Sequence, residues 1–142
     1  MLARSAILSL VAIGLQPVLA AISGCSNPGD HMCSVITAGG AFGDPLSGAS
    51  DSGAYVDISN GACESIVSSG SLQTESPGFY ADLHTTYGTE LRYWADDIGL
   101  GNIHGINFEY LATGKWYYQS GCQQRQVGSD PAYEVVQCNF PC

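Results

Sequence analysis

Six cysteines follow an N-terminal segment with the pattern of a secretory signal peptide, and this combination constrains the fold more than any other feature. The segment carries one basic residue, Arg4, then an apolar run, and ends with Val18 and Ala20 at positions suited to cleavage. The run is shorter than the roughly 20 residues that span a bilayer. We therefore predict a cleaved leader over 1–20, no membrane span, and one secreted domain over 21–142.

The cysteines form an even set in a chain expected outside the cell. In that setting an even set predicts three disulfide bonds and no free thiol. The spacing matches no common zinc-binding pattern and includes no C-x-x-C pair, so neither a metal site nor a thioredoxin-like role is predicted. The pairing stays open, but the layout indicates bridges that hold both ends of the chain: the residues are Cys25, Cys33, Cys63, Cys122, Cys138 and Cys142.

The acidic character of the chain excludes several classes of partner. The sequence has 13 acidic and 4 basic residues, for a formal net charge of −9. Loss of Arg4 with the leader leaves 3 − 13 = −10. Nucleic-acid binding requires clustered Lys and Arg that neutralise phosphates, so no nucleic-acid partner is expected. Anionic lipid head groups are disfavoured for the same reason.

Hydrophobic patterning predicts an α+β fold, a small disulfide-stapled domain. We expect a mostly antiparallel sheet of about four or five strands with one or two short helices. One helix is predicted from Asn60 to Gly70, because Asn60 suits a cap and Ile66 and Val67 fall on one apolar side. Segment 77–87 is ambiguous. Its flanking Pro and Gly favour a helix, which we prefer, while alternating polar and apolar residues fit a strand.

The clearest unit is a hairpin with arms over 104–111 and 116–122 and a turn at 112–115. The predicted register places Leu111 opposite Trp116 and Tyr110 opposite Tyr117. Because side chains alternate along a strand, the two faces separate. One face carries Ile106, Phe108, Tyr110 and Tyr117, and the other carries Glu109, Leu111, Trp116 and Tyr118.

Three residues on the second face, Glu109, Trp116 and Tyr118, are the candidate partner-binding residues. Exposed aromatic side chains mark binding surfaces, which is the basis of this prediction. Together with Trp94 and Tyr117, the rings would suit a flat platform for a sugar or a partner protein. About half of these rings should instead lie in the core, because one face of a sheet is buried.

A second set of residues has the side-chain types used in acid–base catalysis: His84, Glu90, Arg92, His104 and Glu109. Small secreted ribonucleases use two acid–base groups and a cation for the phosphate. We prefer scattered surface polar residues, because so few basic side chains disfavour a phosphate substrate. No catalytic residue, cofactor or metal is assigned; the three histidines and Asp96-Asp97 lack metal-motif spacing.

A signal peptide, a short acidic chain, six cysteines and a final cysteine resemble the small secreted cysteine-rich proteins of filamentous fungi. Many of those are effectors of plant pathogens. A shorter stretch, which includes Gly121-Cys122, residues 128–131 and the following Tyr133, is similar to a segment of the viral killer toxins of smut fungi. Those toxins have more cysteines. The resemblance implies a secreted non-enzymatic effector or toxin-like protein that binds a host or competitor component.

The partner, an unidentified host protein or glycan, stays open, and a monomer is expected. Two alternative functions also stay open. One is a small secreted hydrolase, most concretely a ribonuclease, which would need a cleft joining His84, Glu90 and His104. The other is a glycan or cell-wall binding protein, which would need aligned exposed aromatic residues.

Overall fold

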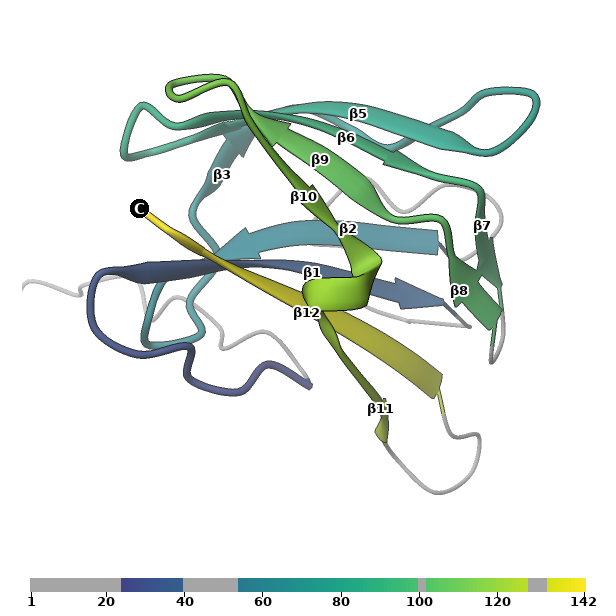
Figure 1. Ribbon diagram of the computed structural model, residues 1–142, viewed down its shortest axis with the longest axis horizontal. Coiled ribbons are helices and arrows are strands. Elements are labelled where there is room, and N and C mark those ends of the chain that lie inside the picture. The colour runs from purple at the N-terminus through teal and green to yellow at the C-terminus, as the bar shows by residue number, and fades with distance from the viewer. Residues whose placement is uncertain (1–23, 40–53, 100–101, 128–132) are drawn as a thin grey trace, which may run out of the picture.

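The computed structural model describes residues 24–39, 54–99, 102–127 and 133–142, which form two packed layers of β-strands (Figure 1). The predicted leader over 1–20 lies outside the described residues. One layer, here called the terminal sheet, has the order β11-β12-β1-β2. Its strands are β11 (Gln123–Val127), β12 (Tyr133–Pro141), β1 (Met32–Gly39) and β2 (Ala54–Ser59).

The second layer, here called the central sheet, has the order β10-β9-β6-β5-β3, with β4 also paired to β5. All pairings in both sheets are antiparallel. Its strands are β3 (Val67–Ser69), β4 (Gln73–Thr74), β5 (Phe79–Thr85), β6 (Glu90–Ala95), β9 (Asn107–Tyr110) and β10 (Lys115–Tyr118).

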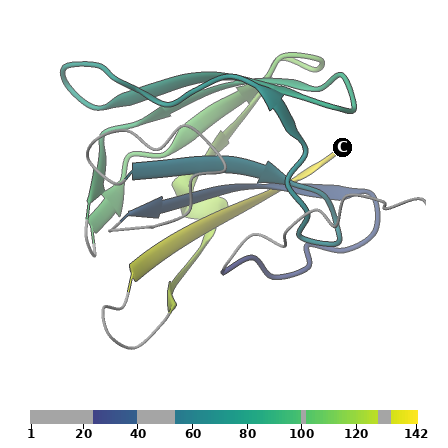
Figure 2. The same ribbon diagram turned by 180° about the vertical axis from the view of Figure 1, so that it is seen from behind.

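Short elements close the ends of this sandwich. A hairpin of β7 (Asp97–Gly99) and β8 (Asn102–His104) stands at one end. The view from behind shows β3 crossing between the layers at the opposite end (Figure 2). A 3₁₀ turn, η1 (Gln119–Gly121), leads the chain from β10 in the central sheet to β11 in the terminal sheet.

The core between the sheets consists mainly of aliphatic side chains, together with a small cluster of aromatic rings. Phe140 of β12 makes edge contacts with the rings of Phe108 and Tyr110, each at a centroid distance of 5.6 Å. Tyr93 of β6 is fully buried, and its hydroxyl hydrogen-bonds with Thr37 Oγ1 of β1 at 2.8 Å. A buried tyrosine hydroxyl needs such a partner, so this bond fixes one sheet against the other.

The predicted α+β class is wrong, because the described residues contain no α-helix. The segment from Asn60 is a turn followed by β3. The Asn60 carboxamide oxygen accepts hydrogen bonds from the backbone N–H groups of Ala62 (2.9 Å) and Glu64 (3.0 Å), which resemble a helix cap. Cys63 then adopts a φ of 61°, in the left-handed region, and that conformation prevents a right-handed helix from propagating.

Segment 77–87 contains strand β5, so the preferred helix is wrong and the alternating pattern was the better guide. Ala81 and Leu83 are buried while Asp82 and His84 are exposed. Strand β5 pairs with β6 on one side and with β3 and β4 on the other. The prediction of one sheet of four or five strands is also wrong, because the described strands form two large sheets and the separate β7–β8 hairpin. Part of the excess comes from β3, β4, β7 and β8, which have only two or three residues and leave no periodic signal.

The disulfide prediction is confirmed: the described residues hold three bridges and no free cysteine. Cys33–Cys142 joins β1 to the residue after β12, and Cys25–Cys63 joins the segment before β1 to the turn before β3. Cys122–Cys138 joins the end of η1 to β12. Two bridges therefore hold the segments near the two ends, as the layout indicated.

The hairpin exists, but its register differs from the predicted one by two residues. Trp116 lies opposite Glu109, and Tyr117 opposite Phe108. The turn spans 111–114 and closes with the Gly114 N–H donating to the Tyr110 carbonyl at 2.9 Å. A shift by an even number of residues keeps every side chain on its face, so the predicted division into two faces holds.

Candidate binding surface

The outward side chains of the central sheet align in rows, because antiparallel strands place register partners side by side on one face. The first row runs across β5, β6, β9 and β10 and consists of Tyr80, Trp94, Asn107 and Tyr118. The second row consists of Asp82, Arg92, Glu109 and Trp116. A third row begins with His84 and Glu90.

Four aromatic side chains from these two rows lie on the same face and are here called the aromatic strip: Tyr80, Trp94, Trp116 and Tyr118. Tyr80 meets Trp94 edge-on at 5.5 Å, and Trp94 stacks with Trp116 at 5.3 Å with an interplanar angle of 19°. Strand β9 separates the two indoles, and two strand spacings are roughly 10 Å. The indoles must therefore lean over β9 to meet. Trp116 is 41% exposed and Tyr118 is 61% exposed.

Polar groups beside the aromatic strip are held by hydrogen bonds. The Asp82 carboxylate accepts from the Tyr80 hydroxyl at 2.5 Å and from Arg92 Nε at 3.1 Å. The hydrogen bond from Tyr80, followed by the interactions with Arg92, lowers the pKa of Asp82 below its ordinary value. The same bond raises the pKa of Tyr80. Asp82 is thus an ionised, oriented acceptor next to the rings.

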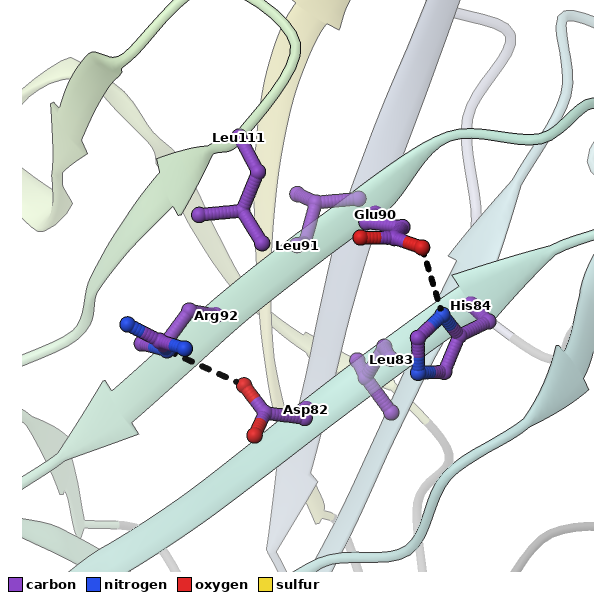
Figure 3. Close-up of a pocket in the computed structure, with 7 residues that line it drawn as sticks. All are labelled: Asp82, Leu83, His84, Glu90, Leu91, Arg92 and Leu111. Atoms are coloured by element: carbon purple, nitrogen blue, oxygen red, sulfur yellow. Dashed lines mark hydrogen bonds and ion pairs between the residues drawn. The ribbon is translucent and has the colours of Figure 1, made fainter.

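At the far end of the same face, His84 and Glu90 form a cross-strand pair (Figure 3). His84 Nδ1 lies 3.3 Å from Glu90 Oε1, and both side chains are about half exposed. A shallow depression joins this pair to Asp82, Arg92 and Leu111. Three of the predicted catalytic types, His84, Glu90 and Arg92, therefore lie together.

The remaining histidine of that set lies elsewhere. His104 belongs to β8, and its Nδ1 is 4.0 Å from Asp96 Oδ2. The backbone carbonyl of His104 accepts from the N–H of Asp96, which follows β6, whereas His84 pairs with Glu90 at the start of β6. At about 3.3 Å per residue the two sites are roughly 20 Å apart along the strand. The structure does not bring the predicted ribonuclease set together.

The candidate partner-binding residues Glu109, Trp116 and Tyr118 all lie on the outward face, and Trp94 joins them. Tyr117 does not, because it faces inward and stacks on Phe108 at 4.9 Å. Sequence reasoning missed Tyr80 and the Asp82–Arg92 pair because it preferred a helix over 77–87. The alternation of Tyr80, Asp82 and His84 was the signal that would have placed them on this face.

Within the described ranges, no group of three or more His, Cys, Asp and Glu side chains is arranged to hold a metal ion. Likewise, no helix in this part of the chain has the length and apolar character to cross a membrane. No family model, curated protein or solved structure matches this chain.

Proposed function

We propose that this protein is a secreted, non-enzymatic binding protein whose aromatic strip holds a glycan on the surface of a host or competitor cell. The observation that carries the proposal is the set of rings on an open sheet face, where Tyr80, Trp94 and Trp116 are in contact and Tyr118 lies two residues along β10 from Trp116. Aromatic rings bind the flat C–H faces of sugars, and large exposed aromatic side chains on a domain this small mark a binding site. The oriented carboxylate and guanidinium beside the rings supply partners for sugar hydroxyls.

Secretion is supported by the three disulfides, because such bonds persist in oxidising compartments and are rare in the cytosol. The resemblance to small secreted cysteine-rich fungal proteins is the reason for proposing a host or competitor cell as the site of action. The ribonuclease alternative has less support. His84, Glu90 and Arg92 do lie together, but His104, which the predicted set also requires, lies beside the other end of β6, and Arg92 is already paired with Asp82.

The direct test is co-sedimentation of the oxidised protein with insoluble cellulose, insoluble chitin and calcium-gelled pectin. We expect the wild type to pellet with at least one of them and to remain in the supernatant without polysaccharide. Trp116→Ala and Tyr118→Ala should each weaken binding about tenfold, because a central aromatic anchor typically contributes more than about 1 kcal/mol.

Tyr87→Ala is the matched control, because Tyr87 is 59% exposed, like Tyr118, but lies in the turn between β5 and β6. This variant should bind like the wild type. Thermal melting of all three variants separates loss of binding from loss of fold. Equal binding by Tyr118→Ala and Tyr87→Ala would contradict the proposed surface, and RNA cleavage by the wild type that His84→Ala abolishes would favour the ribonuclease instead.

A further inference from the structure

We infer that the glycan is neutral: a chain of uncharged sugars with equatorial hydroxyl groups, such as a β-linked glucan or an N-acetylglucosamine polymer. This inference rests on the proposed function and names its ligand class. Three features of the outward face carry it: the sign of its charges, the prior engagement of its only guanidinium, and the order of its rows.

The charge of the face disfavours an acidic ligand. Across the strands that form it, Asp82, Glu90 and Glu109 supply three carboxylates against the single guanidinium of Arg92. Two other basic side chains lie nearby: His84 on this face is paired with Glu90 at 3.3 Å, and Lys115 Nζ lies 4.9 Å from the ring centre of Tyr117, which faces the core side of β10. Like charges repel, so a uronate or a sulfated sugar would meet an unfavourable field.

Arg92 is also already engaged. Its Nε donates to Asp82 at 3.1 Å, and Asp82 is held in turn by the Tyr80 hydroxyl. Because Asp82 already neutralises the charge of Arg92, the pair offers an acidic sugar no net positive charge. Sugar hydroxyls, by contrast, can donate to Asp82 and accept from the remaining N–H groups of Arg92 without breaking the pair.

The order of the rows matches a sugar chain that lies across the strands. Residues two apart on one face of a strand are about 7 Å apart, so Asp82, Arg92 and Glu109 run parallel to the ring-bearing first row at that spacing. Sugars stacked on the aromatic strip would present their edge hydroxyls to these groups. A protein partner would instead have to desolvate the same charges, which is costly unless each is paired.

The experiment uses tryptophan emission, because Trp94 and Trp116 are the only two tryptophans in the chain and both belong to the aromatic strip. Oxidised protein is titrated with cellohexaose, N-acetylchitohexaose and hexagalacturonic acid. We expect a saturable change with a neutral hexamer and none with the acidic one. The dissociation constant for the neutral hexamer should change less than about twofold between about 0.05 M and 0.5 M salt, because no ion pair forms.

Three variants refine the test. Tyr118→Ala, which keeps both tryptophans, should weaken neutral binding about tenfold, and Tyr87→Ala should leave it unchanged. Glu109→Gln has opposite expected effects on the two ligand classes: it should weaken binding of the neutral hexamer, because an N–H donor replaces one of the two carboxylate oxygens that accept from sugar hydroxyls, whereas it would strengthen binding of an acidic ligand by removing a negative charge. Preferential, salt-sensitive binding of hexagalacturonic acid that Tyr118→Ala abolishes would overturn the inference and leave the proposed function standing. Failure of all three sugars to bind would overturn both.

Discussion

Asp57 is the buried carboxylate that anchors the turn before β3. It is 2% exposed, and it accepts hydrogen bonds from the Tyr55 hydroxyl (2.6 Å), the Ser65 hydroxyl (2.8 Å) and the N–H of Ile58 (2.6 Å). Burial raises the pKa of Asp57, and these hydrogen bonds offset that effect only in part. The folded protein therefore favours the protonated form of Asp57 more than the unfolded chain does.

Because its folded pKa is raised, the contribution of Asp57 to stability is fully present below its unfolded pKa of about 4 and is lost as pH rises through the raised value. Asp57→Asn removes this loss, since an amide does not ionise. As pH rises from about 4 to about 7, we expect the free energy of unfolding of wild type to fall relative to that of Asp57→Asn, because only the wild type loses this contribution. Urea titrations across this range test it, with the exposed Asp30→Asn as control; parallel curves for Asp57→Asn and wild type would contradict it.

At the scale of elements, two glycines with positive φ lie in the turns that end strands β9 and β8. Gly114 (φ 64°) closes the turn between β9 and β10, and a Cβ there would meet no atom within 4 Å. Gly105 (φ 73°) follows β8, and a Cβ there would lie 2.6 Å from the Cβ of Asp96. Both positions need a positive φ, but only at Gly105 would an added Cβ also collide with another residue.

We expect Gly114→Ala to lower the free energy of unfolding by about 1–2 kcal/mol, the usual cost of the left-handed region for a non-glycine residue. Gly105→Ala should cost more, because Asp96 and the β7–β8 hairpin must also move. Chemical denaturation of the two variants gives the comparison directly. Equal losses would show that the hairpin adjusts to the added methyl group without strain.

At the scale of the whole molecule, the disulfides differ in the length of chain they close. Cys33–Cys142 joins residues 109 apart, and Cys122–Cys138 joins residues 16 apart. Each bridge has one buried partner, Cys33 or Cys138, so the packing lost on substitution is similar. The two bridges therefore separate the effect of loop length from the effect of packing.

Replacing both cysteines of Cys33–Cys142 by alanine should cost about 4–5 kcal/mol, against about 3 kcal/mol for Cys122–Cys138, because the longer loop restricts the unfolded chain more. Urea denaturation under oxidising conditions measures both. A larger loss from the Cys122–Cys138 variant would mean that local geometry at η1, rather than chain entropy, governs stability.

The alternation of polar and apolar residues was sufficient to predict the facing of side chains on strands that bury one face and expose the other. Alternation through Phe108, Glu109, Trp116 and Tyr117 fixed which rings point outward, and an error of two residues in the register left that assignment intact. The even set of cysteines likewise predicted three bridges. Pairing could not be derived, since sequence spacing does not determine which cysteines become neighbours in space.

Tertiary structure decided the rest, because each remaining feature depends on contacts between distant segments. Asn60 and the Pro and Gly around 77–87 carry helix-end signals, but pairing of β5 with β3, β4 and β6 overrode those preferences. The meeting of Trp94 with Trp116 across β9, and the alignment of Tyr80 with them, likewise required the strand order of the central sheet. The sequence determined which side chains were available for a binding surface, but only the placement of β5, β6 and β10 in one sheet brought those side chains together.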